Sequence, residues 1–61
     1  MASPVKYRVV HQMLKTNKWW LDRVRGSHHT YTNGTRSYTF PVHQNEVKNV
    51  YVKEIKSILE I

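Results

Sequence analysis

Residues 26–43 read Gly-Ser-His-His-Thr-Tyr-Thr-Asn-Gly-Thr-Arg-Ser-Tyr-Thr-Phe-Pro-Val-His, and this stretch decides the fold. Asn33-Gly34 is a strong hairpin signal, because a type I′ turn needs positive φ at both of its central residues. The segments on either side are rich in the β-branched and aromatic residues that favour strands. We therefore expect antiparallel strands over residues 28–32 and 36–40, with Pro41 ending the second one.

A further strand is expected immediately before this hairpin. Residues 19–25, Trp-Trp-Leu-Asp-Arg-Val-Arg, are again rich in strand formers and end at Gly26-Ser27, where we expect a turn. Strand alternation places Trp19 and Leu21 on one face, as core residues, and Trp20 on the other, where it is free to stack on a partner. The three segments together predict an antiparallel meander.

An amphipathic helix is expected before the meander. Ser3-Pro4 has the pattern of an N-cap followed by proline at the first helical position, so the helix is predicted to run from Pro4 to Thr16. Asn17 is expected to end it in the left-handed conformation. The apolar residues that recur at helical spacing are Val5, Val9, Val10, Met13 and Leu14.

A second helix is expected after the meander. Residues 44–48 form a polar segment that we expect to be a loop, and Asn49 can cap the helix that follows. Its apolar residues fall on one side: Val52, Ile55, Ile58 and Leu59. The predicted order is α-β-β-β-α, an α+β fold in which two helices pack on one face of a three-stranded antiparallel sheet.

Size and charge narrow the function classes. The 61 residues are expected to form a single domain, residues 1–61, too small for a deep substrate pocket. Ten Lys and Arg against four Asp and Glu give a formal net charge of +6, which favours a polyanionic partner such as a nucleic acid. Lys6, Arg8, His11 and Lys15 interrupt any apolar signal core, so we expect a cytoplasmic protein with no membrane segment.

Candidate phosphate-binding residues flank the hairpin. They are Lys18, Arg23, Arg25 and Arg36. A metal site is not expected, because strand alternation points the neighbouring His28 and His29 to opposite faces and the chain has no cysteine. We expect no cofactor. Histidine itself suits proton transfer near neutral pH, because its unperturbed pKa is about 6.5.

Three sequence motifs in this order resemble a known family. Asn17-Lys18-Trp19, Gly26-Ser27-His28-His29 and Phe40-Pro41-Val42-His43 match the pattern of the HicA (YcfA) family over about residues 7–59. These are small bacterial mRNA-interferase toxins, similar in fold to double-stranded-RNA-binding domains and held inactive by a HicB antitoxin. Lys18 stands where the family usually has glycine, so we expect Asn17 to supply the left-handed residue of that turn.

The resemblance implies a metal-independent endoribonuclease that cleaves mRNA and blocks translation. The functional histidine of the family maps to His28 or His29, acting as general acid or base. We favour His28, because it follows the small residues Gly26 and Ser27, which let a phosphate approach the backbone and the serine hydroxyl. His43 is expected either to transfer a second proton or to order its loop and contact RNA. A HicB-like antitoxin is the implied partner, with the free toxin a monomer and the complex a hetero-oligomer.

Two other functions fit the same basic surface. A non-catalytic double-stranded-RNA-binding module would use it for phosphate and shape contacts, although the chain is short for such a domain. A protein-interaction domain would use it to bind an acidic partner. Cleavage of RNA by the pure protein separates the enzyme from both.

Overall fold

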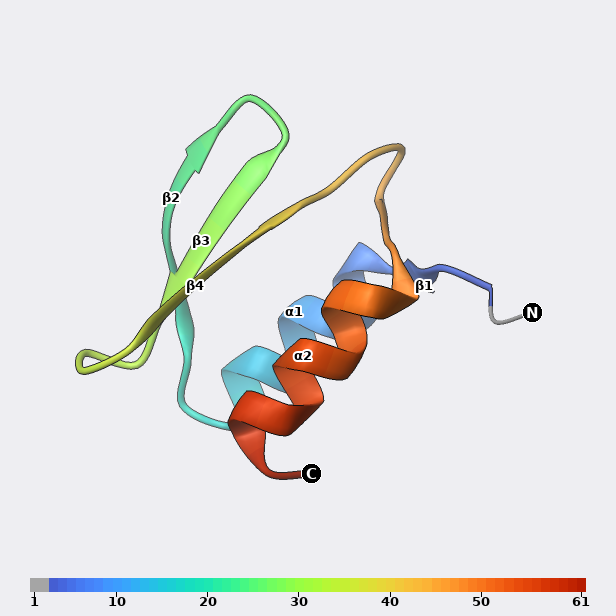
Figure 1. Ribbon diagram of the computed structural model, residues 1–61. Helices are drawn as coiled ribbons and strands as arrows, with labels where there is room; N and C mark the ends of the chain where they lie inside the picture. Colours follow the sequence, from blue (N-terminus) through green and yellow to red (C-terminus); the bar gives the residue numbers. More distant parts are fainter. Residues whose placement is uncertain (1–2) are drawn as a thin grey trace.

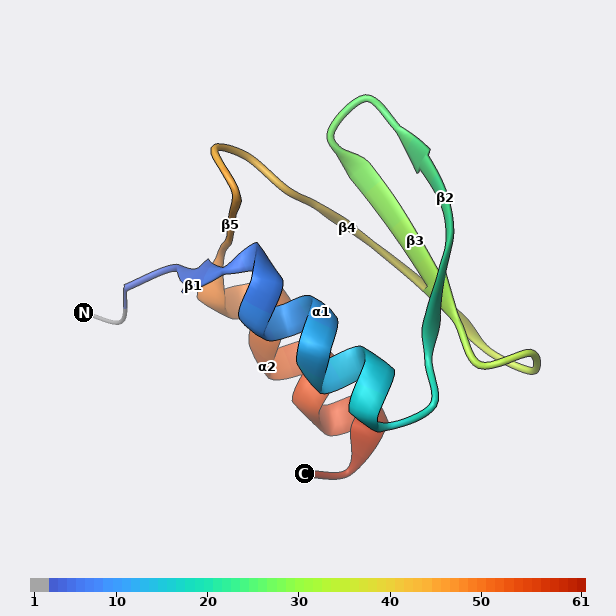
Figure 2. The same cartoon turned by 180° about the vertical axis from the view of Figure 1, so that it is seen from behind.

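The computed structural model describes residues 3–61; Met1 and Ala2, which belong to the predicted domain of residues 1–61, lie outside them. Strands β2, β3 and β4 form one antiparallel sheet in that order, and the short strands β1 and β5 pair separately. Figures 1 and 2 show helices α1 and α2 on the same side of the three-stranded sheet. The predicted α+β fold is therefore confirmed. The element bounds are β1 Val5–Lys6, α1 Tyr7–Thr16, β2 Trp20–Arg25, β3 His28–Thr32, β4 Ser37–Pro41, β5 Glu46–Val47 and α2 Asn49–Leu59.

The strand register defines two faces of the sheet. His29 pairs with Phe40 and Tyr31 pairs with Tyr38. Because directly opposed residues share a face, these four side chains point together. Tyr31 and Phe40 are buried in the core with residues of both helices, so this is the helix side of the sheet. His28, Thr30 and Thr39 point the other way, to the open side.

A β-bulge in β2 reverses the alternation of that strand. Leu21 pairs with Tyr31 on the helix side, but the register shifts between Leu21 and Arg23, so that Arg23 pairs with Thr30 and Arg25 with His28. Without the extra residue at Asp22, Arg23 and Arg25 would have stayed on the helix side with Leu21. The bulge therefore places both arginines on the open side, together with His28.

The two hairpin connections differ from each other, and only the second differs from the expectation. Gly26, with φ of 56°, is the first of two residues that join β2 to β3, as in a type II′ turn. The expected type I′ turn at Asn33-Gly34 is wrong, because a four-residue loop, residues 33–36, joins β3 to β4. Gly34 has φ of 96°, whereas Asn33 instead uses its side-chain oxygen to accept the N–H groups of Thr35 and Arg36 at 2.9 and 2.7 Å.

The segment after β4 is more ordered than the polar loop we expected. Gln44 and Asn45 both have positive φ, 53° and 61°, and the flanking His43 and Glu46 exchange both backbone hydrogen bonds. The two-residue type I′ geometry therefore occurs here rather than at Asn33-Gly34. Val47 in β5 is fully buried and pairs with Val5 of β1.

The first helix begins later than predicted. Residues 5–6 form β1, and α1 begins at Tyr7 with Lys6 at its N-cap and no side-chain cap, so Ser3-Pro4 does not start it. Pairing of β1 with β5 keeps residues 5–6 extended. Val9 of the predicted apolar face is exposed, while Val10 and Leu14 are buried.

The end of α1 is closed by Lys18. Asn17 has φ of −95°, so it is not left-handed as we expected, and Lys18 takes φ of 68° instead. The Trp19 N–H then donates to the Leu14 carbonyl at 2.9 Å, and the Trp19 side chain enters the core. Lysine adopts the conformation for which glycine is normally used, which costs free energy.

The second helix matches its predicted face. Val52 and Ile55 are buried, and Ile58 and Leu59 pack partly buried against the same core. Lys48, rather than the predicted Asn49, is the N-cap, and it makes no side-chain cap bond. The buried apolar residues of both helices, the sheet and β5 form one cluster: Val10, Leu14, Trp19, Tyr31, Phe40, Val47, Val52 and Ile55.

Candidate nucleic-acid interface and catalytic histidines

One carbonyl in the β2–β3 turn links the start of β3 to the residue that follows β4. The Ser27 carbonyl accepts the Val42 N–H at 2.7 Å and lies 3.1 Å from Nδ1 of His29. A Cβ built on Gly26 would meet no atom within 4 Å, so the tip of the turn is open. A phosphate can approach the backbone there.

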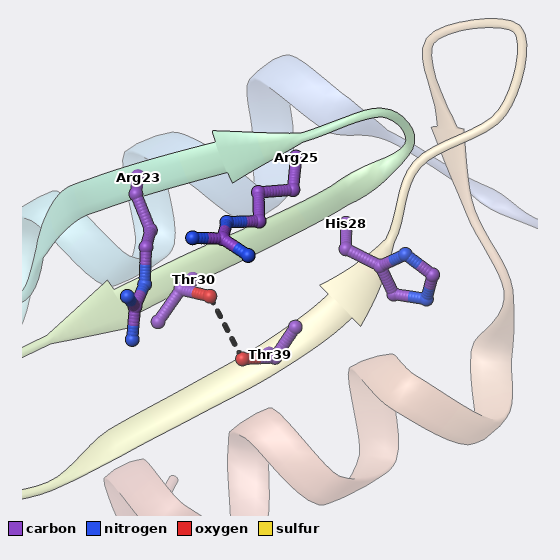
Figure 3. Close-up of a pocket in the computed structure, with 5 residues that line it drawn as sticks. All are labelled: Arg23, Arg25, His28, Thr30 and Thr39. Atoms are coloured by element: carbon purple, nitrogen blue, oxygen red, sulfur yellow. Dashed lines mark hydrogen bonds between the residues drawn. The ribbon is translucent and has the colours of Figure 1, made fainter.

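A shallow pocket on the open side of the sheet gathers three of the predicted site residues. It has a volume of about 360 Å³ and is lined by Arg23, Arg25, His28, Thr30 and Thr39. Figure 3 shows these side chains on one side of the strands, with helix α1 passing behind. The Thr30 and Thr39 hydroxyls, 2.8 Å apart, join β3 to β4 at the pocket floor.

The chemistry of this pocket suits an anion. Two guanidinium groups supply planar sets of N–H donors, the geometry that binds phosphate oxygens. Arg23 Nε lies 3.9 Å from the Asp22 carboxylate, but the side chains of Arg23 and Asp22 are 63% and 50% exposed. Because an exposed ion pair is weak, the Arg23 guanidinium stays available to a ligand. Trp20 lies further along the same side of β2 and is 52% exposed, as a stacking residue would be.

His29 lies on the opposite, helix side and is half-buried. Its ring is edge-to-face with Tyr7 of α1, with centroids 4.9 Å apart, and stacks on Phe40 at 6.5 Å. Nδ1 faces the Ser27 carbonyl, an acceptor, so Nδ1 carries the proton in this contact. Within residues 3–61 no buried side-chain nitrogen or oxygen lacks a hydrogen-bond partner, and His29 Nε2 makes no hydrogen bond. Nε2 therefore reaches the surface.

A hydrogen-bonded group that the sequence analysis missed lies beside His29. The Tyr31 hydroxyl is 2.6 Å from the Tyr7 hydroxyl and 2.6 Å from Nδ1 of His11. Burial, and then the bond to Tyr7, raise the pKa of Tyr31 far above its usual value, so the phenol stays protonated. The signal in the sequence is the four-residue spacing of Tyr7 and His11, which puts both on one helix face.

This group is open to solvent on the side of β2. Leu21 and Val24 pair with Tyr31 and His29 and point to the helix side, yet they are 38% and 47% exposed. Every residue of β2 is exposed, so no helix covers this strand. A surface between α1 and β2 therefore gives access to the histidine side chains of that face.

The remaining predicted residues lie apart from the pocket and from His29. Lys18 is in the turn after α1, and Arg36 is in the β3–β4 loop at the far end of the hairpin. His43 is exposed beside the Gln44-Asn45 turn, and its backbone, through Glu46, orders that turn. In residues 3–61 no three His, Asp or Glu side chains gather as a metal site would need. No helix in that range is long and apolar enough to cross a membrane.

Fold and site define a small, basic α+β protein with an anchored, surface-reaching histidine at a hairpin turn and an arginine pocket on the other face of the same strand. Residues 7–61 match the family model described as the HicA toxin of bacterial toxin–antitoxin systems. The chain belongs to the HicA toxin family, and membership implies an antitoxin partner. Comparison with curated proteins and with solved structures gave no match.

Proposed function

We propose that this toxin is a metal-independent endoribonuclease that cleaves mRNA and thereby blocks translation. The observation that carries the proposal is the state of His29: Nδ1 is held by the Ser27 carbonyl and Nε2 is free at the surface. A general base needs a fixed orientation and an unprotonated nitrogen that a substrate can reach. His29 has the fixed ring and the accessible nitrogen, on a chain with a net charge of +6.

The reaction follows from the chemistry of RNA. The 2′-hydroxyl is an internal nucleophile for the adjacent phosphorus, and removal of its proton by Nε2 of His29 activates it. The transition state gathers negative charge on the phosphoryl oxygens, which backbone N–H groups stabilise. This assigns the base role to His29 rather than to His28, which the sequence alone had favoured.

His28 has a different role in this proposal. It shares the open pocket with Arg23 and Arg25, where it binds a phosphate next to the one that reacts. Arg25 and His28 are the pair that closes the two-residue turn. An RNA strand that crosses this turn, along Gly26 and Ser27, reaches the pocket on one face and His29 on the other. Lys18, Arg36 and His43 are then outlying backbone contacts.

The same proposal covers the antitoxin partner and the cellular location of the toxin. A HicB-like antitoxin inhibits by covering the turn and His29, since a shallow site is easily masked. The free toxin is a monomeric single domain in the cytoplasm, similar in fold to a double-stranded-RNA-binding domain, and it forms a hetero-oligomer with the antitoxin.

Cleavage without metal, compared between two alanine variants, tests the proposal. The pure protein is incubated with RNA and excess chelator, beside His28→Ala and His29→Ala, with circular dichroism to confirm that each is folded. We expect His29→Ala to abolish cleavage while it still binds RNA. We expect His28→Ala to bind more weakly and to cleave at close to the normal rate when RNA is saturating.

Two results would overturn this assignment in different ways. Loss of cleavage at saturating RNA in His28→Ala alone would move the catalytic role to His28. Intact RNA, bound with similar affinity by all three proteins, would show a non-catalytic RNA-binding module instead of an enzyme.

A further inference from the structure

The four rings of Tyr7, His11, His29 and Tyr31 form a continuous group of contacts between α1 and β3. Tyr7 faces His29 with centroids 4.9 Å apart, and His11 faces Tyr31 at 5.8 Å. Tyr7 and His11 are four residues apart in the helix, a rise of about 6 Å, and His29 and Tyr31 are two residues apart in the strand, about 6.7 Å. Because the two spacings match, each helix ring can face one strand ring. Both histidine rings lie next to the Tyr7 ring, with centroids 6.0 Å from it for His11 and 4.9 Å for His29.

The ring of His11 is held in the same way as that of His29. Its Nδ1 is fixed by the Tyr31 hydroxyl at 2.6 Å, and the ring is half-buried. Since Nε2 makes no hydrogen bond and no buried side-chain nitrogen in residues 3–61 is unpaired, Nε2 of His11 also reaches the surface. The chain therefore holds two imidazoles with anchored Nδ1 atoms and free Nε2 atoms around one tyrosine ring.

Resting on the ribonuclease function proposed above, we propose that His11 is a second catalytic residue, the general acid that protonates the leaving 5′-oxygen. His29 Nε2 takes the 2′-hydroxyl proton as the 2′-oxygen forms its bond to phosphorus. The bond from phosphorus to the 5′-oxygen breaks, and the proton on His11 Nε2 passes to that oxygen. The products are a 2′,3′-cyclic phosphate and a free 5′-hydroxyl, with His29 protonated and His11 neutral until both exchange protons with water.

Tyr31 is the positioning residue in this arrangement. When its hydroxyl donates to Tyr7, its oxygen accepts Nδ1–H of His11, so the proton that His11 gains and loses is the one on Nε2. Tyr31 keeps its own proton because it is buried, and it therefore holds His11 in the same tautomer before and after transfer. Within residues 3–61, His11 is the only titratable side chain other than the tyrosines themselves that is hydrogen-bonded to the hydroxyls of this group.

The test uses two substrates and the variant His11→Asn. Asparagine keeps a polar atom near the Nδ1 position for Tyr31 but cannot transfer a proton. On ordinary RNA at saturation, we expect a rate lower by roughly a hundred- to ten-thousand-fold and loss of the alkaline limb of the pH profile. On RNA in which sulfur replaces the leaving 5′-oxygen, the departing thiolate needs no proton, so His11→Asn should cleave at close to the wild-type rate.

His29→Ala and Tyr31→Phe are the matched controls. His29→Ala should stay slow on both substrates, because the nucleophile still needs its base. Tyr31→Phe should lower the rate on ordinary RNA, keep both limbs of the pH profile and be rescued by the sulfur substrate. If the wild type cleaves RNA but His11→Asn is equally active, the role of His11 is refuted and the ribonuclease function stands. The same holds if the sulfur substrate does not restore cleavage by His11→Asn. A wild type that cuts neither substrate would refute the ribonuclease function and this inference together.

Discussion

His28 and His29 are neighbours in the chain, but their side chains lie on opposite faces of the sheet. His28 pairs with Arg25 and Pro41 on the open side, and His29 pairs with Val24 and Phe40 on the helix side. Two histidines that adjoin in the sequence therefore cannot share a substrate atom across the strand. In the proposed function, phosphate binding by His28 and proton transfer by His29 are therefore separated by one peptide unit, and we expect substitutions to remove either function alone.

The open-side pocket predicts a change in the salt dependence of RNA binding. Arg25→Gln removes one guanidinium from the pocket, and we expect weaker binding together with a smaller slope of log K against log salt, by roughly 0.7 for one lost phosphate contact on a single strand. Lys53→Gln changes the charge equally on the exposed face of α2 and should leave the slope unaltered. Fluorescence anisotropy titrations over a series of salt concentrations measure both. Equal salt slopes for Arg25→Gln and Lys53→Gln would show that RNA phosphates do not bind in this pocket.

The left-handed turn after α1 predicts that a glycine there stabilises the protein. Lys18 has φ of 68°, a conformation that costs an L-residue with a Cβ about 1 kcal/mol. Lys18→Gly removes this cost, so its urea midpoint should rise despite the added freedom of the unfolded chain. Lys18→Ala removes the same charge but keeps the Cβ, and it should show no gain. A urea midpoint for Lys18→Gly at or below that of Lys18→Ala would show that the left-handed backbone of Lys18 is not strained.

The β3–β4 loop predicts a specific need for the side-chain carbonyl of Asn33. This oxygen accepts the N–H groups of Thr35 and Arg36. Asn33→Ala loses both bonds and should lower the free energy of unfolding by about 1 kcal/mol. Asn33→Asp keeps an acceptor in the same place and should cost much less. Urea unfolding of the two variants compares them, and equal losses would show that the loop does not depend on this oxygen.

The sequence predicted what periodicity and local turn chemistry control. The bounds of β3 match the expected residues 28–32, the Gly26-Ser27 turn is present, and Val52 and Ile55 face the core. The short strands at Val5 and Val47 were not predicted, because two-residue strands carry no period and exist only through their pairing. Asn33-Gly34 correctly marked the hairpin between β3 and β4, but not its turn type, because a longer loop closed by the asparagine side chain joins the strands.

The site was harder to predict than the fold, because tertiary packing builds it. Alternation alone would put Arg23 on the helix side with Leu21, and a bulge that leaves no mark in the sequence moves it to the pocket. The partnership of His11 with Tyr31 joins residues 20 positions apart and depends on how α1 lies over β3. Sequence reasoning found the two adjacent histidines but not the helix residues that surround one of them.

Two tyrosines predict the alkaline limit of stability. Burial raises the pKa of Tyr31 and of Tyr38 well above the usual value near 10, and the bond that Tyr38 donates to Glu54 Oε2 at 2.5 Å adds to the shift of Tyr38. A pKa that is higher in the folded state means that the stabilisation is fully present below pH about 10 and is lost as the pH rises further, because the unfolded chain ionises first. Urea midpoints should therefore be flat between pH 8 and 9 and fall steadily above 10. Tyr38→Phe should be less stable at pH 8 by about 1 kcal/mol and should lose less on going to pH 11, because one of the two phenols with a raised pKa is gone. Parallel pH curves for the wild type and Tyr38→Phe would show that Glu54 does not hold this phenol protonated.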